Sequence, residues 1–124
     1  MALVKVVGMD HIVLRCTDVE RALAFYCDRL GLEGERVDAW RRGEALFPSV
    51  RITATTVIDL FAGTRDGTNL DHFCLVIEPS DLDALAVAFP DAQRAEHLFG
   101  AQGYASSLYV HDPEGNIVEL RSYA

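Results

Sequence analysis

Cysteines, basic residues and long apolar runs are all scarce in this 124-residue chain, and each scarcity argues against a class of structure or binding partner. The three cysteines, Cys16, Cys27 and Cys74, are scattered, so we expect buried reduced thiols rather than a disulfide framework. Acidic residues number 19 against 11 basic ones, and the formal net charge of −8 argues against binding to nucleic acid or to an anionic membrane surface. No apolar stretch reaches the ~20 residues that a membrane-spanning helix needs.

The remaining composition is that of an ordinary globular domain, half apolar and about a quarter charged. A chain of this length buries roughly two-thirds of its unfolded surface, which is enough for a core without disulfides. The apolar residues 1–8 are too short for a secretion signal, and the scattered cysteines lead us to expect a cytoplasmic protein. We predict a single domain over residues 1–124.

The chain contains an internal repeat. The sequence Asp-His-Ile-Val-Leu at residues 10–14 returns as Asp-His-Phe-Cys-Leu at residues 71–75, and an amphipathic run follows each copy. Each half then closes on an acid within an apolar strand, Asp59 in the first half and Glu119 in the second. The spacing predicts two modules of order β-α-β-β-β, at about residues 9–62 and 70–123, with a linker at about 63–69.

In the first module, residues rich in β-branched side chains predict strands at 9–16, 32–41, 44–52 and 55–61. After the first strand, apolar residues recur at helical period, and Gly31 ends the run. Thr17 or Asp18 caps this helix. An Arg42-Gly43 turn separates the second strand from the third.

In the second module, the same reasoning predicts strands at 70–77, 92–99, 106–111 and 116–123. A helix opens at Pro79 and Ser80 and ends near Pro90. The last two strands form a hairpin around the Pro- and Gly-containing turn at 112–115.

Histidines and acids at matching places in the repeat suggest a metal site. A lone histidine on a strand is more often packed or exposed than a ligand, but here a carboxylate follows both His11 and His72, after 48 and 47 residues. Two imidazoles and one carboxylate make a facial triad that leaves about three coordination positions open. A fourth ligand from Asp59 would leave fewer, which favours Lewis-acid chemistry.

Charged residues near these histidines have two interpretations each. Asp10 and Asp71 either begin a strand or orient the imidazole that follows them. Arg15, Arg51 and Arg121 either meet an anionic substrate or extend from strand ends into solvent.

Three stretches resemble the vicinal oxygen chelate superfamily, which includes glyoxalase I, extradiol dioxygenases, methylmalonyl-CoA epimerases, and the fosfomycin and bleomycin resistance proteins. They are residues 9–14, residues 24–32 with the pattern FYxxxLGL, and residues 109–120 with the pattern DPxGNxxEL. The chain most resembles small single-domain proteins of the glyoxalase/bleomycin resistance/dioxygenase type. The resemblance implies an α+β fold in which two βαβββ modules form an open barrel-like mixed sheet.

The resemblance also implies a divalent metal held by His11, His72 and Glu119, with Fe²⁺ or Mn²⁺ favoured and Zn²⁺ or Ni²⁺ as alternatives. Such a metal would stabilise negative charge on a small substrate chelated through neighbouring oxygens, in a dioxygenase- or lyase-type reaction. Four-ligand members carry a glutamate where this chain has the shorter Asp59, which is then a ligand, a base or a polar wall of the pocket. The resemblance further implies a homodimer.

Tyr109 and His97 bear on the dioxygenase assignment. Extradiol dioxygenases, which this chain resembles, carry a tyrosine at the position of Tyr109 that hydrogen-bonds the substrate; packing within the sheet is the alternative. The acid–base histidine of those enzymes falls at Gly100 here, and His97 is out of register by three residues. We therefore expect His97 and His111 on the surface or in turns, and Cys74 in the core.

Two other functions stay open at this stage. A glyoxalase I-like isomerase or lyase, or a related thiol transferase, would use Asp59 as a fourth ligand. A bleomycin resistance-like protein would bind a small molecule without metal, but the retained histidines and glutamate argue against it.

Overall fold

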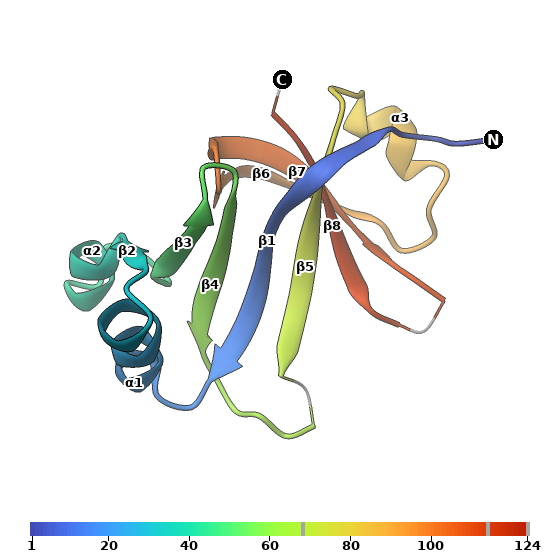
Figure 1. Ribbon diagram of the computed structural model, residues 1–124. Coiled ribbons are helices and arrows are strands. Elements are labelled where there is room, and N and C mark those ends of the chain that lie inside the picture. The colour runs from blue at the N-terminus through green and yellow to red at the C-terminus, as the bar shows by residue number, and fades with distance from the viewer. Residues whose placement is uncertain (68, 114, 124) are drawn as a thin grey trace. The chain divides into compact units, whose positions relative to one another are not determined.

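The computed structural model describes residues 1–67, 69–113 and 115–123, and Figure 1 shows the order of its elements. The chain divides into two units: unit 1 comprises residues 1–11 and 72–124, and unit 2 comprises residues 12–71. Strands β1 (Val6–Cys16) and β5 (Leu70–Ile77) contribute residues to both units. Three positions of predicted features lie outside the described residues: Thr68 in the linker, Glu114 in the hairpin turn and Ala124 at the end of the domain.

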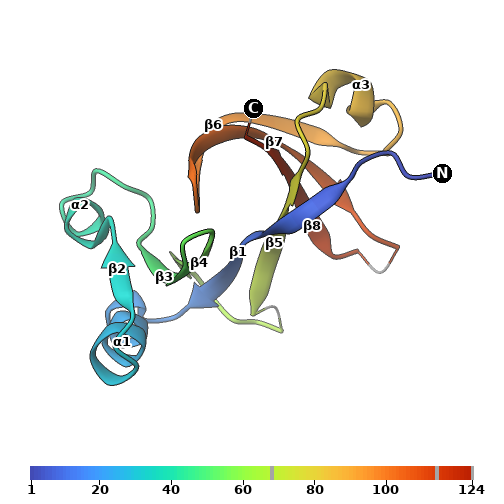
Figure 2. The same ribbon diagram turned by 45° about the horizontal axis from the view of Figure 1, so that its top comes forward.

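Unit 1 contains strands in the order β1-β5-β8-β7-β6. Strand β8 (Ile117–Ser122) runs parallel to β5, and β7 (Gly103–His111) is antiparallel to both β8 and β6 (Gln93–Gly100). Figure 2 shows β6 and β7 following the same curve side by side. The short helix α3 (Leu82–Ala86) places Leu82 and Leu85 in one core with Leu108 and Leu120 of the strands.

Unit 2 contains strands in the order β2-β3-β4-β1, with β2 at Glu33–Glu35, β3 at Ser49–Thr53 and β4 at Thr56–Ala62. Helix α1 (Val19–Leu23) is capped by Asp18, whose side chain accepts a hydrogen bond from the Arg21 backbone N–H. The helix continues as the π-helical η1 (Ala24–Arg29) and ends at Gly31, where φ is 76°. The predicted helix, its cap and its end are therefore confirmed. A core of Val19, Leu23, Val50 and Leu60 lies beneath it.

The predicted strands at 32–41 and 44–52 are largely wrong. Only Glu33–Glu35 and Ser49–Thr53 are strands, and helix α2 (Val37–Arg41) lies between them. The chain leaves the extended conformation at Arg36, where φ is 57°, and Gly43 ends the helical turn at φ 79°. Val37 and Trp40 lie three residues apart, so they share one helical face and pack together against the core of unit 2. Tertiary packing thus overrides the β propensity of this segment.

The other predicted strands are confirmed within a few residues. They correspond to β1, β4, β5, β6, β7 and β8.

Candidate metal centre

Three ligand atoms from three strands of unit 1 converge. His11 belongs to β1, His72 to β5 and Glu119 to β8. The Glu119 Oε1 atom lies 3.1 Å from His11 Nε2 and 3.2 Å from His72 Nε2, and the two imidazole rings meet edge to face with centroids 5.6 Å apart. One ligand atom from each residue lies within 4.8 Å of the other two, so the three side chains could hold one metal ion.

Strand pairing brings these residues together. Strands β5 and β8 are parallel neighbours, and Cys74 lies opposite Glu119 in their register. His72 precedes Cys74 by two residues, so it shares the same face of the sheet. His11 and Glu119 are only 2% and 1% exposed, and such burial is costly for polar side chains that lack partners.

The second carboxylate oxygen of Glu119 is held by the protein. Ser107 Oγ donates a hydrogen bond to Glu119 Oε2 at 2.7 Å, and Arg121 Nη1 donates to the same oxygen at 3.0 Å. Burial raises the pKa of Glu119, but the hydrogen bonds to His11, His72 and Ser107 outweigh it, so this pKa lies well below its usual value. Glu119 is therefore an ionised carboxylate that presents Oε1 to the two imidazoles.

Asp10 is fully buried and orients His11. Its Oδ2 atom lies 2.7 Å from His11 Nδ1 and accepts a hydrogen bond from the Ala101 backbone N–H at 2.9 Å, while the Tyr123 hydroxyl donates to Oδ1. Burial raises the pKa of Asp10, but these hydrogen bonds lower it more, so it lies below its usual value. Of the two interpretations of Asp10, the structure supports the one in which its carboxylate orients the imidazole.

Arg121 belongs to the same network, which the sequence pattern did not indicate. The prediction that it meets substrate or solvent is wrong, because its side chain is 0% exposed. Its Nη2 atom donates to the carbonyl oxygens of Gly103, at 2.9 Å, and Leu98. Gly100 leaves room for this guanidinium, since a Cβ there would lie 2.4 Å from Arg121 Cζ. The sequence signal was the place of Arg121 two residues after Glu119, on the same face of β8.

A family model for the Glyoxalase/Bleomycin resistance protein/Dioxygenase superfamily matches residues 8–120. The chain belongs to this superfamily. Among curated proteins, the glyoxalase domain-containing protein RDO1 of Mycosarcoma maydis is 29% identical over 131 residues, which cover 94% of this chain and 68% of that protein.

Solved structures from the superfamily share the fold. The 2,3-dioxygenase LapB from Pseudomonas sp. KL28 matches with a TM-score of 0.68 and 19% identity, over 98% of this chain and 42% of LapB. Methylmalonyl-CoA epimerase from Mycobacterium tuberculosis matches with a TM-score of 0.60 and 20% identity, over 100% of this chain and 93% of the epimerase. The Mn(II)-bound glyoxalase from Novosphingobium aromaticivorans matches with a TM-score of 0.67 and 19% identity, over 97% of this chain and 40% of that glyoxalase.

These likenesses confirm the predicted α+β fold class, and at such low identities they concern the fold alone. The chain spans less than half the length of LapB and of the manganese glyoxalase. Two chemistries, oxygenation and isomerisation, are therefore compatible with the superfamily's fold.

Tyr109 lies beside the triad of His11, His72 and Glu119. It pairs directly with Glu119 across β7 and β8, and its ring meets that of His72 at a centroid distance of 5.5 Å and an angle of 71°. Burial raises the pKa of Tyr109 well above its usual value, and the Glu119 carboxylate raises it further. The phenol therefore stays protonated at neutral pH and is available as a hydrogen-bond donor.

Asp59 belongs to unit 2, where it is 2% exposed. Ser49 Oγ donates a hydrogen bond to Asp59 Oδ1 at 2.6 Å, across the β3–β4 pair. The same combination of serine and acid occurs in unit 1, where Ser107 donates to Glu119. The sequence repeat thus extends to the way in which each acid is held.

The remaining predicted histidines lie on the surface, as expected: His97 and His111 are both exposed. His97 stacks on Tyr104 with centroids 4.3 Å apart, at an irregularity in the β6–β7 register. Cys74 is 0% exposed, as predicted for a core residue. Its thiol, Asp10 and His11 form a second group of buried donor atoms within 4.8 Å of one another.

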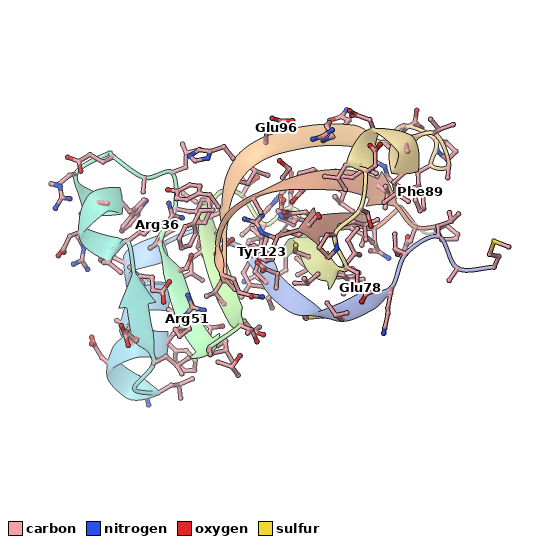
Figure 3. The ribbon with its side chains drawn as sticks, turned by 90° about the horizontal axis from the view of Figure 1, so that it is seen from above. Arg36, Arg51, Glu78, Phe89, Glu96 and Tyr123 are labelled. Atoms are coloured by element: carbon pink, nitrogen blue, oxygen red, sulfur yellow. The ribbon has the colours of Figure 1, made fainter. Side chains whose placement is uncertain are left out.

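Two arginines considered as substrate contacts bind acids within unit 2. Arg15 donates to Asp71 at 3.0 Å and lines a cleft of about 430 Å³ with Arg21 and Arg65. Arg51, labelled in Figure 3, donates to Glu35 through Nε at 2.6 Å and Nη2 at 2.8 Å.

Among the described residues, no helix has the length and apolar character needed to cross a bilayer.

Proposed function

We propose that this chain is a divalent-metal enzyme that binds a small substrate through neighbouring oxygens. His11 Nε2, His72 Nε2 and Glu119 Oε1 would hold the metal, and the reaction would be of the dioxygenase or lyase type. Membership of a superfamily whose solved structures include dioxygenases and a manganese glyoxalase supports this class of chemistry.

The distances from Glu119 Oε1 to the two imidazole nitrogens are the observation that carries the proposal. Ligand atoms bonded to a metal at ~2.1 Å and separated by ~90° lie about 3.0 Å from each other, whereas tetrahedral ligands lie about 3.4 Å apart. The measured separations from Glu119 Oε1 are 3.1 Å to His11 and 3.2 Å to His72. Two imidazoles and one carboxylate suit Fe²⁺ or Mn²⁺ best in such a facial arrangement, with Zn²⁺ and Ni²⁺ as alternatives. The residues therefore fit the metal that the superfamily implies.

A bound metal would act as a Lewis acid on the chelated substrate oxygens, and as Fe²⁺ it would also support O₂ chemistry. The neighbouring side chains have separate tasks. Asp10 accepts a hydrogen bond from His11 Nδ1–H, so Nε2 is the nitrogen that would bond a metal. Tyr109 keeps its hydroxyl proton at neutral pH, so its O–H would donate a hydrogen bond to a substrate oxygen.

A glyoxalase-like isomerase or lyase is the second candidate, because one observation favours it. Asp59 is buried and is held by Ser49 as Glu119 is held by Ser107. A carboxylate held in this way keeps a fixed orientation, which a ligand role would require. Such an enzyme would be active with Zn²⁺, Ni²⁺ or Mn²⁺ and would consume no O₂.

Metal binding is the first test. The protein is prepared metal-free, and Fe²⁺, Mn²⁺ or Zn²⁺ is added under anaerobic conditions, with stoichiometry read by elemental analysis and affinity by calorimetry. One metal per chain is expected for the wild type and for the control His111→Ala, which removes an exposed histidine. His72→Ala should lose at least about 100-fold in affinity, as expected when one of three ligands is removed.

Activity is then screened with the loaded protein. O₂ uptake with catechols would identify a dioxygenase, and turnover of a glutathione hemithioacetal without O₂ uptake would identify the glyoxalase-like alternative. A stoichiometry near zero in the wild type, or unchanged affinity in His72→Ala, would refute the metal site and favour a metal-free binding protein.

A further inference from the structure

Two buried charged residues of unit 1 lie behind the metal triad, and each contacts one of its members. Asp10 bonds His11, Arg121 bonds Glu119, and the Arg121 Nε and Asp10 Oδ1 atoms lie 3.9 Å apart. Both side chains have no exposed surface, so neither can meet a substrate directly.

We propose that Asp10 and Arg121 are positioning residues, which determine the single atom that His11 and Glu119 each present to a metal, and that the β6–β7 turn anchors them both. The proposal rests on the metal site of the proposed function.

Asp10 selects the tautomer of His11. A neutral imidazole carries one N–H and one lone pair, and the nitrogen whose partner is a hydrogen-bond acceptor keeps the proton. Asp10 Oδ2 lies 2.7 Å from His11 Nδ1, so this hydrogen bond keeps a proton on Nδ1 and makes Nε2 the nitrogen that would give its lone pair to a metal. It is the Nε2 atom that lies 3.1 Å from Glu119 Oε1.

Arg121 leaves Glu119 Oε1 as the oxygen that faces the two imidazoles. Its Nη1 atom and Ser107 Oγ both donate to Oε2, at 3.0 and 2.7 Å. A carboxylate with two donors on one oxygen binds a metal through the other oxygen alone. Single-oxygen coordination leaves one more position for substrate than bidentate coordination would.

The turn between β6 and β7 anchors this arrangement through its backbone. The Ala101 N–H donates to Asp10, the Gln102 N–H donates to the Tyr123 hydroxyl at 3.0 Å, and the Gly103 carbonyl accepts from Arg121. Tyr123, labelled in Figure 3, in turn donates to Asp10. Gly100 completes the turn because any larger residue would overlap the Arg121 guanidinium.

The first test compares Asp10→Asn with Asp71→Asn. These are identical changes before the two histidines of the repeat, but Asp71 accepts a hydrogen bond from Arg15 on another strand. Asp10 accepts three hydrogen bonds, from His11, Ala101 and Tyr123, whereas asparagine offers one oxygen and an N–H₂ group. At least one donor would then face another donor.

Two measurements are made on these variants. Nitrogen-15 NMR of the metal-free protein reports the His11 tautomer, and calorimetry with Mn²⁺ alone reports affinity. Asp10→Asn should lower the proton occupancy of His11 Nδ1 and weaken Mn²⁺ binding by about 10- to 100-fold, while Asp71→Asn should change neither. An unchanged His11 tautomer in Asp10→Asn overturns the role of Asp10. Because the tautomer is read without metal, this result differs from failure of the metal site, in which the wild type binds no Mn²⁺.

The second test concerns Arg121. Gly100→Ala would displace the guanidinium without removing any polar group, and Gly8→Ala is the control, because nothing lies within 4 Å of a Cβ there. Mn²⁺ affinity should fall about tenfold in Gly100→Ala and stay constant in Gly8→Ala. If Gly100→Ala does not fold, Arg121→Lys replaces it, since lysine keeps the charge but loses the two-nitrogen fork. Wild-type affinity in the folded variant would overturn the role of Arg121.

Discussion

Replacing Arg121 with methionine should strongly destabilise unit 1. The guanidinium donates to Glu119 Oε2 at 3.0 Å and to the Gly103 carbonyl at 2.9 Å, and the side chain is 0% exposed. Methionine fills similar space but donates no hydrogen bond, so the Glu119 and Asp10 carboxylates would stay buried without their cation. Breaking a buried ion pair in this way costs about 3–5 kcal/mol. The Nε atom of Arg121 has no hydrogen-bond partner among the described residues, which places the expected cost near the lower end.

Urea unfolding of the metal-free protein at pH 7 measures this cost. The matched control is Arg15→Met, because Arg15 forms a comparable 3.0 Å ion pair with Asp71 while its side chain is 35% exposed. A partly exposed pair contributes roughly 0–1 kcal/mol, so the control should unfold near the wild-type midpoint. Thermal unfolding should show a decrease in Tm of about 10–20 °C for Arg121→Met.

The double variant Arg121→Met/Glu119→Gln separates the ion pair from the loss of packing. Removing both charges should recover at least about 1 kcal/mol relative to the sum of the single changes, since the coupled carboxylate is then neutral. If Arg121→Met costs no more than Arg15→Met, or if the double variant shows no coupling, the buried network does not stabilise the fold as argued.

The metal-free protein should lose stability as the pH falls below about 5. Glu119 and Asp10 have lowered pKa values in the folded state, so the unfolded chain binds protons first as the pH falls. Glu119→Gln should reduce this loss of stability, measured by urea unfolding between about pH 7 and pH 3. Tyr109→Phe should leave Mn²⁺ affinity unchanged in calorimetry and lower kcat/KM about tenfold with any substrate that the screen identifies, the loss expected for one hydrogen bond. Asp59→Asn should change Mn²⁺ affinity by less than about threefold; a loss of tenfold or more would instead identify a fourth ligand.

The repeat made the triad predictable from the sequence. Period-two patterns placed His11, His72 and Glu119 within strands, and the strands exist within a few residues of their predicted limits. Local signals were sufficient for the strands themselves because strand alternation and turn residues act over short distances, whereas the pairing of β5 with β8 brings His72 and Glu119 together.

Features that depend on distant contacts were not predictable. Residues 37–41 have strand-like composition, yet they form α2 because Val37 and Trp40 pack on a core supplied by other segments. Arg121 is buried although arginine usually reaches solvent. Its guanidinium donates hydrogen bonds to Glu119 and to the Gly103 carbonyl, and Gly100, which has no Cβ, leaves room for it. Strand alternation places Arg121 on the same face of β8 as Glu119, but no pattern within β8 indicates that its guanidinium is buried.

The two Asp-His pairs of the repeat show how identical sequence leads to different physical roles. Asp10 is wholly buried in unit 1 and bonds the imidazole beside it, whereas the Asp71 side chain is 25% exposed in unit 2 and bonds Arg15. The ring of His72 packs edge to face with Tyr109. Asp10 therefore orients the first imidazole, while a hydrogen bond with Glu119 and packing against Tyr109 help to place the second. Because a buried carboxylate constrains its partner more strongly than a solvated one, sensitivity to mutation should concentrate at Asp10 even though the repeat treats both aspartates alike.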